Sequence, residues 1–147
     1  MDAFEQKVRW YVYDYFVKQA RPPTIAETSA GLSVPLERVQ LAYRHLHQQH
    51  AFFLEPGRDE IRMANPLSAV PTQFLVHAGG RSYWANCAWD ALSIPAMLRL
   101  DATIAAICAD CQEPLVLTVA ADQVQGRSEI IHFALPLRQW YEDLIIT

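Results

Sequence analysis

A cysteine and an aspartate stand three positions apart in the apolar stretch SYWANCAWDALSIPAM, residues 82–97. Asn86 is a common type of helix N-cap, so we expect Cys87 near the first turn of a helix and Asp90 on the same helical face. Backbone N–H groups and the helix dipole would favour the thiolate form of Cys87. A thiolate beside a carboxyl group suits attack on a soft electrophile coupled to proton transfer. Cys87 and Asp90 are therefore candidate catalytic residues.

The same residues also have structural interpretations. Free cysteine is often buried and behaves as a small hydrophobic residue. An aspartate in the first turn of a helix can simply accept hydrogen bonds from exposed N–H groups. Trp84, before the pair, and Trp89, between its two residues, are candidate apolar walls of a substrate site, although either could equally belong to the core. The spacing alone leaves these alternatives open.

A second cysteine pattern lies downstream, where Cys108 and Cys111 form a C-x-x-C sequence at an expected β-turn. This spacing supplies half of the ligands of a zinc knuckle. A tetrahedral site would need two more ligands, for which Cys87 and His132 are candidates. The sequence has no second C-x-x-C, so capture of a soft metal ion by Cys87, Cys108 and Cys111 is favoured over zinc binding.

The first half of the chain predicts three helices followed by two short strands. Apolar residues recur at spacings of three and four in the first segment, and Thr24 with Glu27 matches a capping box at the start of the second. Ser33 is the expected cap of the third helix. This order is typical of a winged-helix module, so we predict a winged-helix-like domain over residues 1–70. The expected elements are helices 3–19, 25–31 and 34–48 and strands 51–55 and 60–64.

The second half, residues 71–147, is strand-rich and contains one short central helix that carries Cys87 and Asp90. Prolines at the end of the first half indicate a connector. We predict an α+β fold, with a small mixed or antiparallel sheet in this second domain. The expected strands are 72–78, 81–85, 102–108, 114–120 and 129–135, followed by a helix over 137–145.

Composition narrows the class of protein. The chain has 147 residues and a net charge of −4, and residues 1–70 carry eight basic and eight acidic side chains. Neither half has the basic excess that phosphate binding requires, so a nucleic-acid partner is not expected. The third helix is nevertheless expected to expose Arg38, Gln40 and Arg44, whose side chain types can contact base edges. The odd number of cysteines, three, argues against a disulfide framework. The sequence shows no secretory signal and no apolar run long enough to span a bilayer, so we expect a cytoplasmic protein without a membrane partner.

The segment from Trp84 to Ala96 resembles the active-site segment of the organomercurial (alkylmercury) lyase family, whose pattern is W/Y-x-x-C-A-x-D-x-L-x-x-P-A. The resemblance implies protonolysis of a carbon–mercury bond, which yields a hydrocarbon and Hg(II) without an organic cofactor. It implies that Cys87 binds mercury, that Asp90 takes part in proton transfer and that Cys108 has a structural role. Weaker similarities to the family lie at Arg21-Pro22, Ala30-Gly31, Pro35 to Val39, Pro114, Leu117 to Val119, His132-Phe133 and Trp140.

The chain departs from this family in its later part. The family supplies a second catalytic cysteine near the strand expected at 129–135, whereas these 147 residues contain no cysteine after Cys111 and stop at Thr147. We expect a shortened family member in which an external thiol extracts Hg(II). The leading hypothesis is an alkylmercury-lyase-like enzyme acting on a small organomercurial. The alternatives are a non-catalytic binder of Hg, Zn or Cu ions and a winged-helix transcriptional regulator that senses a thiophilic ligand.

Overall fold

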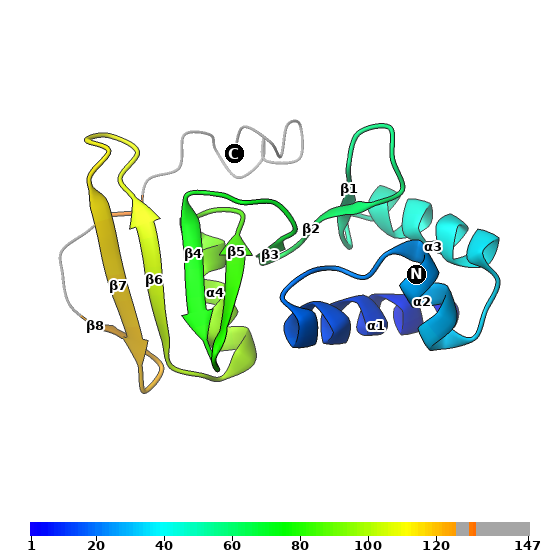
Figure 1. The fold of residues 1–147 in the computed structure, drawn as a ribbon, viewed down its shortest axis with the longest axis horizontal. Coiled ribbons are helices and arrows are strands. Elements are labelled where there is room, and N and C mark those ends of the chain that lie inside the picture. The colour runs from blue at the N-terminus through cyan, green and yellow to red at the C-terminus, as the bar shows by residue number, and fades with distance from the viewer. Residues whose placement is uncertain (126–129, 132–147) are drawn as a thin grey trace.

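The computed structural model describes residues 1–125 and 130–131, and it places a group of three helices beside an antiparallel sheet (Figure 1). A fourth helix covers one face of the sheet. The helices are α1 (Ala3–Gln19), α2 (Ile25–Leu32), α3 (Leu36–Gln48) and α4 (Ala88–Leu98). The strands are β1 (Phe53–Leu54), β2 (Ile61–Ala64), β3 (Leu67–Ser68), β4 (Phe74–Ala78), β5 (Arg81–Ala85), β6 (Ala102–Ile107), β7 (Pro114–Ala120) and β8 (Gln123–Gln125).

Local capping explains where the first helices begin. Asp2 and Glu5 form a capping box at α1, and Thr24 and Glu27 form the predicted one at α2. The expected role of Ser33 is wrong. Ser33 is the C-cap of α2 in the left-handed region, and α3 begins after Pro35 without a side-chain cap. Proline at this position loses no helical hydrogen bond, because the first N–H groups of a helix have no partner within it.

The described strands form one sheet in the order β1-β2-β3-β5-β4-β6-β7-β8, and every pairing is antiparallel. The α+β class is therefore confirmed. The short strands β3 and β8 were not expected from the sequence. β3 pairs with both β2 and β5, so the sheet continues across the boundary predicted at residue 70. That boundary and the winged-helix interpretation of the helices and of the β1–β2 pair stay predictions.

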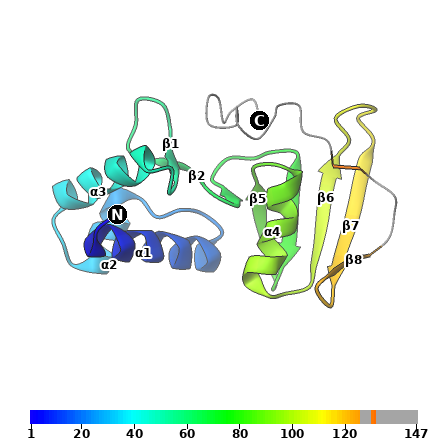
Figure 2. The same cartoon turned by 180° about the vertical axis from the view of Figure 1, so that it is seen from behind.

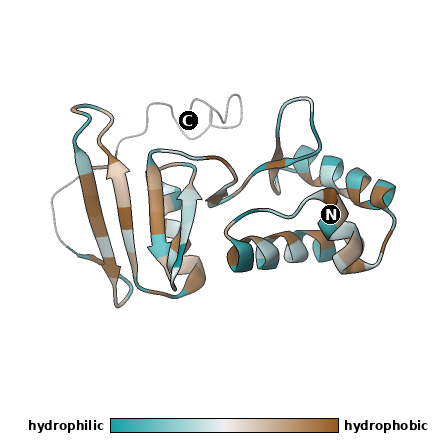
Figure 3. Cartoon of the chain, viewed as in Figure 1, coloured by the Kyte–Doolittle hydropathy of each residue, from teal (hydrophilic) through white to brown (hydrophobic). Residues whose placement is uncertain are grey.

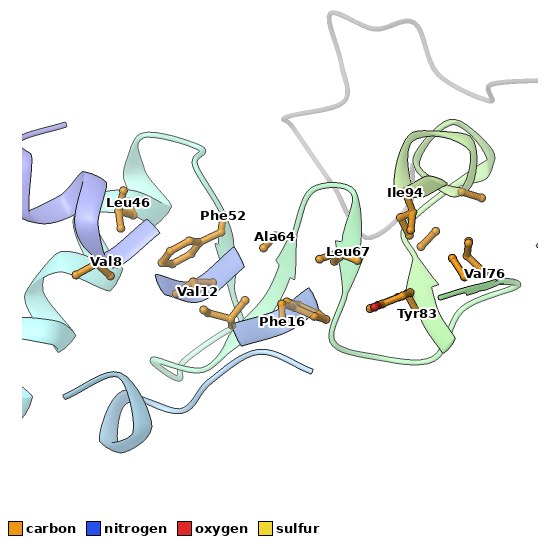
Figure 4. Close-up of a cluster of buried hydrophobic side chains, with 14 of the residues drawn as sticks. Val8, Val12, Phe16, Leu46, Phe52, Ala64, Leu67, Val76, Tyr83 and Ile94 are labelled. Carbon is orange, nitrogen blue, oxygen red and sulfur yellow. The ribbon is translucent and has the colours of Figure 1, made fainter. Parts of the chain in front are cut away.

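One continuous hydrophobic core joins the helical part to the sheet. The buried side chains of Val12 and Phe52 lie next to each other, and the core continues through Phe16 and Leu67 to Ile94 on α4 (Figure 4). Hydrophobic residues also run along β6 and β7 (Figure 3). Seen from behind, α4 lies against β4 and β5 (Figure 2). This packing fixes α4, and with it the first turn that holds the candidate site.

Some predictions concern residues outside the described part of the chain. Most of the strand expected at 129–135, the helix expected at 137–145 and the candidate ligand His132 fall there. Among the residues that the structure does describe, none of the helices combines the length and the apolar character that crossing a membrane requires.

Candidate active site

The chain passes from β5 into α4 through two residues, and the second of them is Cys87. Cys87 is the N-cap of α4, with φ −149° and ψ 178°, and its sulfur accepts the backbone N–H of Asp90 at 3.5 Å. The expected N-cap, Asn86, is therefore wrong by one residue. Because an N-cap side chain turns back over the first helical turn, this shift brings the sulfur directly above Asp90.

The structure brings the side chains of Cys87 and Asp90 into contact. The Cys87 thiol donates to Oδ2 of Asp90, with 3.5 Å between sulfur and oxygen. Both side chains are half-buried, so they keep access to solvent while losing part of their hydration. The geometry places a proton donor and a proton acceptor side by side at the start of the helix.

The resting state of Cys87 differs from the sequence prediction. Burial and the neighbouring negative charge of Asp90 raise the pKa of the Cys87 thiol to about 11. The N–H groups of Asp90 and Trp89 act in the opposite direction, as the helix-dipole argument anticipates, but they do not outweigh these two causes. At neutral pH Cys87 is therefore a thiol, and the prediction of a resting thiolate is wrong.

Asp90 is also shifted by its surroundings. Burial raises the pKa of the Asp90 carboxyl above its ordinary value, while hydrogen bonds from Asn86 and Cys87 oppose the increase. A carboxylate in this state accepts a proton more readily than a fully hydrated one. Asp90 therefore suits a role in which it takes up a proton and later gives it away.

Tyr13 of α1 and Asn65, between β2 and β3, are linked by hydrogen bonds to Asn86, the residue before Cys87. Nδ2 of Asn86 donates to Oδ1 of Asn65 at 3.2 Å, and the Tyr13 hydroxyl donates to the Asn65 carbonyl oxygen at 2.9 Å. Burial raises the pKa of Tyr13, and the negative charge of Asp90 adds to the increase. The guanidinium of Arg9 lies 5.5 Å from the centre of the Tyr13 ring. Sequence reasoning missed Tyr13 and Asn65, because both are distant from Cys87 in the sequence and Asn65 belongs to the predicted connector.

An apolar cavity lies beside the first turn of α4. Its volume is about 570 Å³, and its walls include Ala88 and Ala91 of α4 together with side chains of β4, β6 and β7. Phe74, Ile104 and Leu117 contribute apolar surface to it. The lining includes Ala88, the residue that follows Cys87, but neither Cys87 nor Asp90. The cavity extends to the loop after β6, where Cys108 lines it.

The two tryptophans predicted as substrate walls lie in different places. Trp89 is on the first turn of α4, and 59% of its surface is exposed. Trp84 stands between Tyr83 and Ala85 on β5, and both neighbours are buried in the core that includes α4. Because side chains alternate along a strand, the Trp84 side chain points to the opposite face of the sheet. Of the two, only Trp89 shares an element with Cys87 and Asp90.

The third predicted feature, the C-x-x-C sequence, forms the turn between β6 and β7. Cys108 is half-buried and Cys111 is exposed. Within residues 1–125 and 130–131, no three His, Cys, Asp or Glu side chains gather in an arrangement that could hold a metal ion. The structure therefore does not unite Cys87, Cys108 and Cys111 into one three-ligand site.

Comparisons with known proteins agree on one family. The family model described as MerB: Alkylmercury lyase matches residues 67–145, which include Cys87 and Asp90. Among solved structures, the mercury-bound form of MerB2 matches with a TM-score of 0.70 and 23% sequence identity. The match covers 87% of this chain and 61% of that chain, and at this identity it shows the fold alone. No curated protein matches the sequence.

Proposed function

Because the chain belongs to the alkylmercury lyase family, we propose that Cys87 and Asp90 cleave carbon–mercury bonds by protonolysis. The observation that carries this proposal is the contact between the Cys87 thiol and Oδ2 of Asp90 at 3.5 Å. The substrate is a small organomercurial held by an external thiol, R–Hg–SR′. Since the chain spans about three fifths of the length of its mercury-bound structural relative, the whole reaction is a proposal for this chain.

The first step loads mercury onto Cys87. The sulfur of Cys87 attacks mercury, its proton passes to Asp90, and R′S⁻ leaves. This step converts Cys87–SH, Asp90–COO⁻ and R–Hg–SR′ into R–Hg–S–Cys87, Asp90–COOH and R′S⁻. The high pKa of Cys87 does not prevent the step, because the carboxylate that receives the proton is already in contact with the thiol.

The second step breaks the carbon–mercury bond. The proton held by Asp90 moves to the carbon atom, R–H leaves, and mercury remains on the sulfur as Cys87–S–Hg⁺ beside the regenerated carboxylate. Burial favours the neutral acid of Asp90 until the proton is transferred, and the returning negative charge then lies next to the cationic mercury. Two external thiolates remove the ion as Hg(SR′)₂, and Cys87 regains its proton from solvent.

The organic group would occupy the apolar cavity next to Ala88. Burial of a phenyl or alkyl group there removes apolar surface from water, and Ala88 of its lining directly follows Cys87, the proposed mercury ligand. Trp89 on the same helical turn is the proposed outer wall. The proposed location is the cytoplasm, where thiols stay reduced, and all three cysteines are free in the structure. No resident metal or organic cofactor is part of this proposal.

The proposal is tested by release of benzene from phenylmercuric acetate in excess thiol. Wild-type protein should release benzene, and Cys87→Ser should fall to the rate of thiol alone although it keeps Cys108 and Cys111. Asp90→Asn should lower the rate by about 10²-fold or more, the usual contribution of a positioned proton donor. The matched control is Asp122→Asn, which changes an exposed carboxylate and should behave as wild type. Mercury capture by the wild type without benzene release would contradict the proposal and favour a non-catalytic binder.

A further inference from the structure

The turn between β6 and β7 holds Cys108 and Cys111 in a defined geometry. The N–H of Cys108 donates to the Glu113 carbonyl at 2.9 Å, and the N–H of Gln112 donates to the Cys108 carbonyl at 3.0 Å. Gln112 adopts the left-handed region with φ 61°, which lets the chain reverse within this turn. The four residues from Cys108 to Cys111 are thus fixed by the backbone at both ends of the loop.

This turn directs hydrogen-bond donors at one sulfur. The N–H groups of Cys111 and Asp110 and the thiol of Cys111 all act on the Cys108 sulfur, and together they lower the pKa of Cys108. The two cysteines stand three residues apart in one short turn that these backbone hydrogen bonds close. Cys111 is exposed, so the pair is reachable from solvent, and Cys108 faces the apolar cavity.

We propose that Cys108 and Cys111 form a two-thiolate binding site for Hg(II), separate from Cys87. Thiolates are the preferred ligands of soft metal ions, and an ion that accepts two ligands fits a site of two sulfurs. Zinc requires four ligands, and among the described residues no group of three or more His, Cys, Asp or Glu side chains is arranged to hold a metal ion. The side chains of Asp110 and Glu113 are exposed beside the pair and contribute negative charge that favours a cation.

The site lies where a product ion could be passed on. The cavity that is lined by Ala88, the residue after Cys87, is also lined by Cys108. If Cys87 generates Hg(II), the pair offers a second thiol site, and Cys108 of the pair lines this cavity. This role as an acceptor rests on the proposed function, whereas binding of Hg(II) by the pair does not.

Binding is a ligand exchange without any change in oxidation state. Starting from Hg(SG)₂, the glutathione complex, two Hg–S bonds to Cys108 and Cys111 form and two Hg–S bonds to glutathione break. Each departing glutathione thiolate takes up the proton that a cysteine thiol releases. Binding by one cysteine alone would instead leave a mixed complex, protein–S–Hg–SG, which is heavier because it retains one glutathione.

The test uses native mass spectrometry of the full chain with one equivalent of Hg(II) and glutathione at about 0.1 mM. A neighbouring thiol acts at an effective concentration on the order of millimolar, so the bridged form should exceed the mixed form by about tenfold at that glutathione concentration. Three variants with equal numbers of thiols provide matched controls. Cys87→Ser should keep the bridged, glutathione-free mass, whereas Cys108→Ser and Cys111→Ser should carry the mixed complex.

Two results would overturn the proposal. One is a bridged mass in Cys111→Ser together with a mixed complex in Cys87→Ser, which would assign the chelate to Cys87 and Cys108. The other is the same mass distribution in all three variants. Circular dichroism confirms that each variant is folded before the comparison. Because Cys87→Ser binds Hg(II) in this test but should release no benzene, failure of the site and failure of the lyase proposal are distinguishable.

Discussion

Replacing Asp90 by asparagine should change two properties of the site in opposite directions. The substitution keeps the shape of the side chain but removes its negative charge and its capacity to take up a proton. Removal of the charge should lower the pKa of the Cys87 thiol, since Asp90 is one of the causes that raise it. Cys87 should therefore become more reactive toward an alkylating reagent while carbon–mercury cleavage slows by about 10²-fold or more.

The size of the pKa change follows from the distance between the two groups. At the 3.5 Å that separates Sγ and Oδ2, a unit charge contributes about 1 kcal/mol in a water-like medium and about 5 kcal/mol at an effective dielectric constant of 20. Burial is the larger cause of the increase in the pKa of Cys87 from 9.0 to about 11. The energy contributed by the charge of Asp90 is therefore near the lower of these two values. About 1.4 kcal/mol corresponds to one pKa unit, so Asp90→Asn should lower the pKa of Cys87 by about one unit. At pH 8 this gives roughly tenfold more Cys87 thiolate than in the wild type.

The assay is alkylation of Cys87 by iodoacetamide at pH 8, followed by mass spectrometry of the Cys87 peptide. Because the thiolate is the reacting species, Asp90→Asn should be alkylated up to about tenfold faster than the wild type. A somewhat smaller increase is consistent, since nucleophilicity falls with the pKa. The control Asp122→Asn should alkylate at the wild-type rate. Slower alkylation in Asp90→Asn would refute the reasoning, because it would mean that Asp90 favours the thiolate.

Three further substitutions test the surroundings of the site and the core. Asn86→Ala removes a hydrogen bond that lowers the pKa of Asp90, so the pKa of Asp90 should rise. Because the first step needs ionised Asp90, the acid limb of the pH–rate profile for benzene release should then move to higher pH. An acid limb at the wild-type pH would contradict this role of Asn86. Tyr13→Phe removes the bond to the Asn65 carbonyl and should lower the free energy of unfolding by about 1 kcal/mol, measured in urea. Phe52→Ala opens a cavity at a fully buried position and should cost about 3–5 kcal/mol in the same assay, whereas a cost under about 1 kcal/mol would argue against this packing.

Features governed by neighbouring residues were predictable from the sequence. The helix over residues 3–19 and the capping box of Thr24 and Glu27 appear as expected, because both depend on contacts within one or two turns. The i, i+3 spacing of Cys87 and Asp90 likewise brought the two side chains together. The C-x-x-C turn follows from its position between two strand-like segments.

Features that depend on tertiary packing were not predictable. The pKa of Cys87 is set mainly by burial, which the local helix-dipole argument omits, so the predicted thiolate is a thiol. The contacts of Tyr13 and Asn65 near the site join residues 52 positions apart, and no local pattern indicates such a pair. Trp84 was assigned to the site from its position in the sequence, but strand alternation directs it to the other face of the sheet.

The most direct test of the account is the isotopic content of benzene formed in a single turnover in D₂O. The account requires that the hydrogen delivered to carbon comes from the exchangeable Cys87 thiol through Asp90. Wild-type protein in excess over phenylmercury should therefore yield benzene with one deuterium, and Cys87→Ser should yield none above the thiol background. Benzene without deuterium, or an equal yield from Cys87→Ser, would contradict the account.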